Sequence, residues 1–166
     1  MATDRHVRWI VVVRIAASVL FLVVLTAAIT AFPFVLARNV GHAMEPAVKD
    51  QQRLIVNKLA YWLRDPKSGD VVMVYYPLDP DKSLVRRVIA REGDTVRIIA
   101  GHVYINDKLL SDDYVPTEFR SHEDWGPQIV PMGFYFVLAD HRNSGSDSRY
   151  WGYVPRKYII GTIVVL

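Results

Sequence analysis

The sequence contains no cysteine and has little net charge. Without cysteine, a disulfide scaffold, a thiolate zinc site, an iron–sulfur cluster and a cysteine nucleophile are all excluded. The formal net charge is only +3, and residues 1–14 account for +2 of it because three arginines there outweigh one aspartate. Nucleic-acid-binding proteins concentrate basic charge on their folded part, so this distribution argues against a nucleic-acid partner. The five histidines lack metal-ligand spacing, and the sequence implies neither a metal nor a soluble cofactor.

Residues 15–37 form a long uncharged run that predicts a membrane-spanning helix. At about 1.5 Å per residue, its 23 positions give a helix of roughly 34 Å, enough to cross a hydrocarbon core of about 30 Å. Three arginines precede the run and only Arg38 follows it closely, so the positive-inside rule places the N-terminus in the cytoplasm. The predicted organisation is a cytoplasmic N-terminus (1–14), a transmembrane helix (15–37) in the lipid bilayer, and an exoplasmic domain (38–166).

A cleavable signal peptide is the alternative interpretation of this run. Val35-Leu36-Ala37 resembles a small-residue cleavage site. The apolar segment is, however, about twice as long as the apolar core of a signal peptide, which spans about 7–15 residues. We therefore favour a retained single-pass anchor.

The rest of the sequence predicts a mainly β, antiparallel domain. Short apolar runs bounded by Gly, Pro, Asn or Asp are typical of strands. These runs are Arg53–Asn57, Asp70–Tyr76, Ser83–Ile89, Thr95–Ile99, His102–Ile105, Phe134–Leu138 and Ile159–Val165. The pairs Ala100-Gly101 and Asn106-Asp107 predict hairpin turns. Leu59–Arg64 predicts a short helix, and Arg120–Pro131 predicts a long loop.

Four segments of this domain match known boxes in a fixed order. They are Gly41-His-Ala-Met-Glu-Pro-Ala47, Lys67-Ser-Gly-Asp-Val-Val-Met-Val74, Val85-Arg-Arg-Val-Ile-Ala-Arg-Glu-Gly-Asp94 and Ala139-Asp-His-Arg-Asn-Ser-Gly-Ser-Asp-Ser-Arg-Tyr-Trp-Gly152. In order, they resemble the S-M-x-P-T, R-G-D-I/V-V, K-R-V-I-G-x-x-G-D and G-D-N-R-x-x-S-x-D-S-R-x-x-G boxes of the signal peptidase I family. Members of that family are membrane-anchored serine endopeptidases that remove signal peptides from exported proteins. Four boxes in order behind one anchor argue against a chance resemblance.

The resemblance implies a serine nucleophile activated by a neutral lysine, with a second serine that holds the lysine in place. Burial lowers the pKa of such a lysine because desolvation disfavours its ammonium form. The resemblance also implies that the substrate binds as an extended strand and places small side chains in shallow apolar pockets. The cleft residues carried over from the first box are Gly41, Met44 and Pro46.

All three working positions of the family are substituted in this chain. Ala43 stands at the nucleophile position, Arg86 at the general-base position and Gly145 at the position of the base-orienting serine. A methyl group has no oxygen with which to attack, and a guanidinium with a pKa above about 12 is almost never neutral at pH 7. We interpret this as natural loss, because an engineered inactivation normally replaces one residue. His42 is a weaker candidate base, since family relatives that use histidine carry it where Arg86 stands.

The charged residues of the fourth segment are retained. The resemblance implies that Asp140, Arg142, Asp147 and Arg149 pair to brace the site, and a bidentate arginine–carboxylate contact would give that brace geometric precision. As an alternative, Asp140 and Asp147 form a carboxylate acid/base pair, or bind a metal together with His141. Retention of the arginines favours the structural interpretation.

These observations predict a catalytically degenerate family member in the bacterial plasma membrane. Its expected partners are signal-peptide-like or other extended secreted segments, and an active paralogue is a further candidate; a role in secretion or assembly fits the same cleft. One alternative is an active peptidase, through engineered substitutions or a non-standard nucleophile and base. Another is a purely structural membrane protein without a peptide cleft. A mitochondrial inner membrane is less favoured, because Tyr150–Pro155 resembles bacterial members.

Overall fold

The computed structural model describes residues 2–31 and 33–166, and the side chains of residues 9–28 and 33–166. The chain divides into two compact units, Met1–Phe34 and Val35–Leu166. The first unit contains the predicted helix, and the second contains the residues of the four matched segments.

The helix α1 extends over Ala2–Ala31, and its segment Trp9–Ala28 is long and apolar enough to cross a membrane. The side chains of this segment are exposed in the folded chain, as expected for a surface that faces lipid. The prediction that the helix continues to residue 37 was wrong. Pro33 has no backbone N–H to donate and disfavours a helix that continues through it. Phe34–Arg38 instead forms strand β1, which includes the three residues of the alternative cleavage site.

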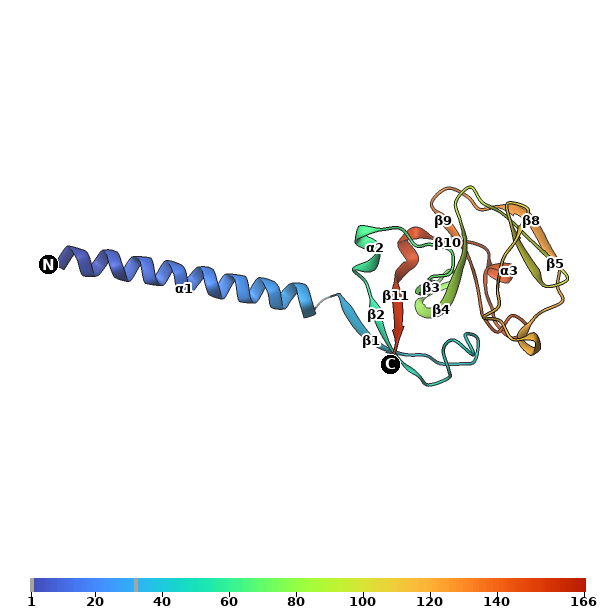
Figure 1. The fold of residues 1–166 in the computed structure, drawn as a ribbon, viewed down its shortest axis with the longest axis horizontal. Coiled ribbons are helices and arrows are strands. Elements are labelled where there is room, and N and C mark those ends of the chain that lie inside the picture. Colours follow the sequence, from blue (N-terminus) through green and yellow to red (C-terminus); the bar gives the residue numbers. More distant parts are fainter. Residues whose placement is uncertain (1, 32) are drawn as a thin grey trace. The chain divides into compact units, whose positions relative to one another are not determined.

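The strands form two sheets, and every pair whose register is described is antiparallel, which confirms the predicted fold class (Figure 1). The larger sheet has the order β1, β2 (Arg53–Asn57), β11 (Ile159–Val165), β3 (Val71–Tyr76), β4 (Asp79–Arg91), β9 (Phe134–Leu138) and β10 (Val154–Pro155). The smaller sheet has the order β7 (Lys108–Leu109), β6 (His102–Ile105), β5 (Thr95–Ile99) and β8 (Trp125–Ile129). Short helical turns connect them: α2 (Ala60–Leu63), α3 (Ser148–Trp151), and the 3-10 helices η1 (Thr117–Phe119) and η2 (Arg156–Tyr158).

Both predicted hairpin turns are confirmed. Ile99 pairs with His102 and Ile105 pairs with Lys108, so each turn has two residues between its strands. The turn residues Ala100-Gly101 and Asn106-Asp107 all have positive φ, which matches the twist that a tight hairpin needs.

The predicted loop Arg120–Pro131 was only partly correct, because it contains strand β8. This strand lies at the edge of the small sheet, where Pro127 costs no ladder hydrogen bond. Gly126 has a φ of 79°, and a Cβ there would lie 2.6 Å from the carbonyl oxygen of Val96 on β5. The Gly-Pro pair is a turn signal in sequence, but here it lets an irregular edge strand approach its neighbour closely.

Two buried clusters determine where the matched segments lie. One cluster joins the two sheets, and its members are Ile89, Ala90, Val96, Ile98, Val103, Val130, Phe136 and Leu138. The other packs Met44 and Val48, from the segment between β1 and β2, against Leu54 and Val85. Met44 and Val48 are each only 1% exposed, so burial of their side chains holds this segment against the large sheet.

Candidate functional site

A cavity of about 290 Å³ lies between strands β3 and β4 and the segment that follows β1. Its walls combine apolar side chains with two arginines. The lining residues are Arg38, Asn39, Val40, Ala43, Met73, Ser83, Leu84, Val85 and Arg86. The cavity therefore brings together two positions that are 43 residues apart in sequence, Ala43 and Arg86.

Hydrogen bonds hold the segment that carries Ala43. The buried amide of Asn39 donates to the carbonyl oxygens of Gly41 and Lys49, both at 3.0 Å. The backbone N–H of Gly41 donates to Asp50 Oδ1 at 2.7 Å, and its φ of 99° favours a residue without a Cβ. The carbonyl oxygen of Ala43 accepts a bond of 3.0 Å from the N–H of His141, which ties the first matched segment to the fourth.

The three predicted cleft residues are not among those that line the cavity. Met44 is 1% exposed and packs in the core beneath the segment. Pro46 is exposed, and Gly41 forms the turn before Ala43. Met44 and Gly41 therefore help to hold the segment that carries Ala43, and the cavity wall is made by residues of β3, β4, the end of β1 and the segment that follows β1.

Arg86 is buried, with only 5% of its surface exposed, and its guanidinium bonds to backbone carbonyls. Its Nε and Nη2 donate to the carbonyl oxygen of Ser146 at 2.9 and 2.7 Å, and its Nη1 donates to the carbonyl oxygen of Val85. Within the described residues, no carboxylate forms an ion pair with it. Burial lowers the pKa of Arg86, and the charge of Asp147 opposes that shift. Its observed role is that of a hydrogen-bond donor that connects β4 to the fourth matched segment.

Gly145 adjoins the residue that Arg86 contacts, but it does not line the cavity. Its N–H donates to the carbonyl oxygen of His141 at 2.9 Å. A Cβ at this position would lie 2.0 Å from the Cβ of Ala139, far inside van der Waals contact. Its φ is not positive, so it is space and not backbone conformation that requires glycine here.

The four charged residues of the fourth segment are all paired, but only two of them pair with each other. Asp147 is fully buried and bonds to Arg149 at 2.8 Å, and it also accepts the N–H of Ala139 at 3.0 Å. Asp140 is fully buried and pairs with Arg87 of β4.

Arg142 completes this set through a partner outside the four segments. It lies 3.3 Å from Asp112, and its carbonyl oxygen accepts a bond of 2.6 Å from Arg149. The four residues and their partners thus tie β4, β9 and the loop after β7 into one network, as expected of a brace.

An acid/base pair or a metal site would need the carboxylates of Asp140 and Asp147 and the ring of His141 to be free of other partners. Each of the two carboxylates is occupied by an arginine. The ring of His141 stacks on Phe119 with centroids 3.8 Å apart, and its Nδ1 contacts the carbonyl oxygen of His42. Over the described part of the chain, no group of three or more His, Cys, Asp or Glu residues is placed to hold a metal ion.

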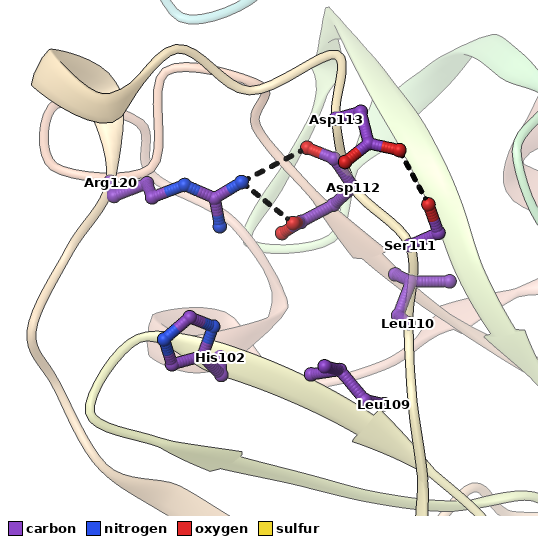
Figure 2. Close-up of a pocket in the computed structure, with 7 residues that line it drawn as sticks. All are labelled: His102, Leu109, Leu110, Ser111, Asp112, Asp113 and Arg120. Atoms are coloured by element: carbon purple, nitrogen blue, oxygen red, sulfur yellow. Dashed lines mark hydrogen bonds and ion pairs between the residues drawn. The ribbon is translucent and has the colours of Figure 1, made fainter.

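A second cavity, of about 320 Å³, lies beside the small sheet, and Figure 2 shows its polar groups facing one another. Arg120 bonds to Asp112 at 2.9 Å, and the hydroxyl of Ser111 donates to Asp113 at 2.7 Å. Its other lining residues are His102, Leu109 and Leu110. Asp112 belongs to the network described above, so this cavity borders the brace and not Ala43.

His42 forms an exposed ion pair with Glu45, at 2.8 Å between Nδ1 and Oε1. The hydrogen bond to Glu45 raises the pKa of His42, and the bond from His42 lowers the pKa of Glu45. A histidine pKa that is raised in the folded state contributes to the free energy of unfolding. This contribution is complete below about pH 6.5 and is lost as the pH rises through the pKa of the folded state. A glutamate pKa that is lowered in the folded state also contributes to the free energy of unfolding. This contribution is complete above about pH 4.5 and is lost as the pH falls through the pKa of the folded state.

We therefore expect an NMR titration of the full chain to give His42 a pKa above its ordinary value of 6.5. Glu45→Gln should return that pKa most of the way, because it removes the paired charge. Glu92→Gln, an exposed carboxylate elsewhere on the domain, should leave it unchanged. A His42 pKa at or below 6.5 in the unmodified chain would contradict this reading of the pair.

The sequence did not single out the cavity residues Met73, Ser83 and Leu84, nor several charged partners of the brace residues. Arg87 lies inside the third matched segment, so its position carried a signal. Asp112 and Arg120 lie outside all four segments, and no local pattern marks them as partners of the fourth segment.

Comparison with known proteins identifies relatives over most of the chain. The family model described as "Signal peptidase, peptidase S26" matches residues 11–166. The chain is 40% identical over 131 residues to "Probable signal peptidase I-2" of Synechocystis sp., covering 74% of this chain and 58% of that protein. It is 34% identical over 157 residues to "Signal peptidase I" of Bacillus licheniformis, covering 87% of this chain and 82% of that protein.

The fold has a solved counterpart in a signal peptidase I from Enterococcus faecalis. The TM-score is 0.54 at 28% identity, and the match covers 61% of this chain and 98% of that one. The chain spans less than two thirds of the length of several curated relatives, including 58% of the Synechocystis protein and 64% of "Signal peptidase I" of Leptolyngbya laminosa.

Proposed function

The chain belongs to the signal peptidase family, peptidase S26, and we propose that it binds extended, signal-peptide-like segments without cleaving them. One observation carries the proposal. Ala43 and Arg86, at the positions where the resemblance places the nucleophile and the base, line one cavity. The cavity is present, but the side chains at these two positions cannot perform the proton transfer.

The chemistry of the cavity wall supports the absence of cleavage. Ser83 supplies the hydroxyl group among the lining residues, and a serine hydroxyl is a weak nucleophile until an adjacent base takes its proton. The ionisable side chains in the same wall are Arg38 and Arg86. A protonated guanidinium only donates hydrogen bonds, so neither arginine can accept that proton.

The same wall supports peptide binding. Val40, Met73 and Leu84 line the cavity together with Ala43 and contribute apolar surface to its wall. A volume of about 290 Å³ accommodates small side chains, and it argues against a purely structural protein whose cleft is packed shut. The intact brace behind the cavity holds the wall in shape without taking part in chemistry.

The anchor and its orientation belong to the same proposal. The apolar helix α1 is consistent with a single-pass membrane anchor. We place residues 1–14 in the cytoplasm and the β domain outside the bacterial plasma membrane, on the strength of the arginines before the apolar run. In this location the chain would meet exported proteins and an active paralogue that cleaves them, and we propose these as its partners.

The test is cleavage of a preprotein by the purified full chain in detergent. We expect none above background for the unmodified chain. A restored variant with Ala43→Ser, Arg86→Lys, Ala139→Gly and Gly145→Ser should cleave at least about 10³-fold faster, because nucleophile and base act as a unit. Ala139→Gly is included because the side chain of a serine at 145 would otherwise collide with Ala139.

The matched control is the same variant with Ala43 retained, which should stay inactive. Robust cleavage by the unmodified chain would overturn the loss of activity. For binding, a noncleavable signal peptide should raise the melting temperature of the unmodified chain, because a ligand that binds only the folded state stabilises it. No shift at saturating peptide would count against a working cleft.

A further inference from the structure

The cavity at Ala43 carries positive charge that nothing in its wall balances. Arg38 and Arg86 both line it, and none of its lining residues is an aspartate or glutamate. Elsewhere in the domain, by contrast, buried arginines such as Arg142 and Arg149 are paired directly with carboxylates. Within the described residues no carboxylate forms an ion pair with the guanidinium of Arg86, and only the more distant charge of Asp147 acts on it, so the cavity is electrostatically suited to an anion.

Arg86 has hydrogen-bonding capacity to spare. A guanidinium has five N–H groups, and Arg86 directs three bonds to the carbonyl oxygens of Val85 and Ser146. Two N–H groups are left over, and the side chain is 95% buried while it still borders the cavity. A carboxylate in the cavity would accept charge-assisted bonds from these groups.

The geometry of β4 determines what kind of molecule would bring that carboxylate. Four consecutive residues, Ser83 to Arg86, line the cavity, although successive side chains of a strand point to opposite faces. The cavity therefore follows the edge of the strand. In the described register, this stretch pairs with β3, whereas pairing with β9 begins only at Arg87. An extended peptide can add to that edge as a further strand.

From these observations we infer that the cavity binds the C-terminal carboxylate of a peptide that ends in small apolar residues. The inference rests on the proposed function and names its ligand class: a product of hydrolysis after a small residue, not an uncleaved substrate. Ala43 and its apolar neighbours would contact the last side chains, and Arg86 and Arg38 would hold the terminal carboxylate. Substitution of a base by an arginine thus changes the ligand that the cleft prefers.

The test compares three acetylated peptides with one apolar sequence ending in Ala-Ala-Ala, measured by calorimetry on the full unmodified chain in detergent. The first has a free C-terminal carboxylate, the second has a C-terminal amide, and the third continues for ten further residues. We expect the carboxylate form to bind about tenfold or more tightly than the other two. Raising the salt concentration should reduce this preference.

The outcomes separate this inference from the proposed function. Equal affinity for all three peptides overturns the preference for a carboxylate but leaves peptide binding intact. Tighter binding of the continued peptide likewise overturns the inference alone. Binding of none of the three overturns both.

A variant pair locates the effect in the cavity. Arg38→Gln should weaken binding of the carboxylate peptide and leave that of the amide peptide unchanged, because Arg38 is exposed and its replacement leaves the core intact. Arg91→Gln, an exposed arginine of β4 outside the cavity, is the matched control and should change neither. Equal losses from both arginine variants would indicate general charge attraction and would overturn the site.

Discussion

Gly145→Ser is expected to destabilise the β domain by about 1–3 kcal/mol, and Ala139→Gly in the same chain is expected to recover most of that loss. The reason is steric. A Cβ at residue 145 would lie 2.0 Å from the Cβ of Ala139, and both belong to a tightly bonded turn that cannot simply move apart. Removal of the methyl group at 139 relieves that contact, and glycine there costs only about 0.5–1 kcal/mol in backbone freedom.

Denaturant unfolding of the four chains of a double-mutant cycle measures this coupling. The two changes should show an interaction energy of about 1–2 kcal/mol, favourable in the double variant. Ala47→Ser, which adds the same hydroxyl at an exposed position, is the control and should shift stability by less than about 0.5 kcal/mol. Additive effects of Ala139→Gly and Gly145→Ser would show that the turn relaxes around the new side chain.

This coupling bears on the loss of activity that we propose. The fourth box of the family has glycine where Ala139 stands and serine where Gly145 stands. In the family the smaller residue is at the first of these positions, whereas in this chain it is at the second. A single reversion at 145 therefore meets a structural obstacle as well as the missing nucleophile. We expect restoration of activity to require both changes of this pair.

Asp147→Ala is expected to cost about 3–5 kcal/mol of unfolding free energy, the largest effect of any single change proposed for the brace. Asp147 is fully buried. Its carboxylate accepts a hydrogen bond from the N–H of Ala139 and three hydrogen bonds from Arg149. Truncation would leave the guanidinium of Arg149, whose side chain is 2% exposed, without its buried partner. It would also remove the side chain that caps the first turn of α3.

Glu123→Ala provides the matched control, because Glu123 contacts the same arginine from the surface. Its carboxylate lies 3.1 Å from Arg149, but its side chain is 48% exposed. Water screens such a pair, so this variant should lose less than about 1 kcal/mol. Chemical unfolding of the full chain in detergent measures both values. Similar losses for the two variants would show that the buried contact is not what stabilises the fourth segment.

The strands and the turns were largely predictable because their signals are local. The runs at β2, β5, β6, β9 and β11 alternate or cluster apolar residues within four to seven positions, and the two tight turns carry residues that tolerate positive φ. Strand β8 was not predictable in this way. Its Gly-Pro pair is a loop signal, and only pairing with β5 makes the segment a strand.

Some features of the site were likewise predictable from local sequence, and others were not. The apolar helix, the resemblance to the family and the three positions that we propose to be substituted could all be read from the sequence, because each depends on residue identity and spacing. The family and the fold are confirmed by comparison, whereas loss of catalysis is a proposal that the cavity supports. Gly41, Met44 and Pro46 were predicted as cleft residues from the resemblance of the first segment; they do not line the cavity at Ala43, and which side chains line it depends on tertiary packing.

By itself, the sequence determined the long apolar helix, the β character of the rest and the family to which the chain belongs. Tertiary structure alone decided that Ala43 and Arg86 share a wall, that Asp140 pairs with Arg87, and that Ala139 approaches Gly145. The physical reason is that composition and local periodicity select secondary structure, whereas strand register and loop packing decide which distant side chains meet. Those contacts determine which side chains line the cavity at Ala43.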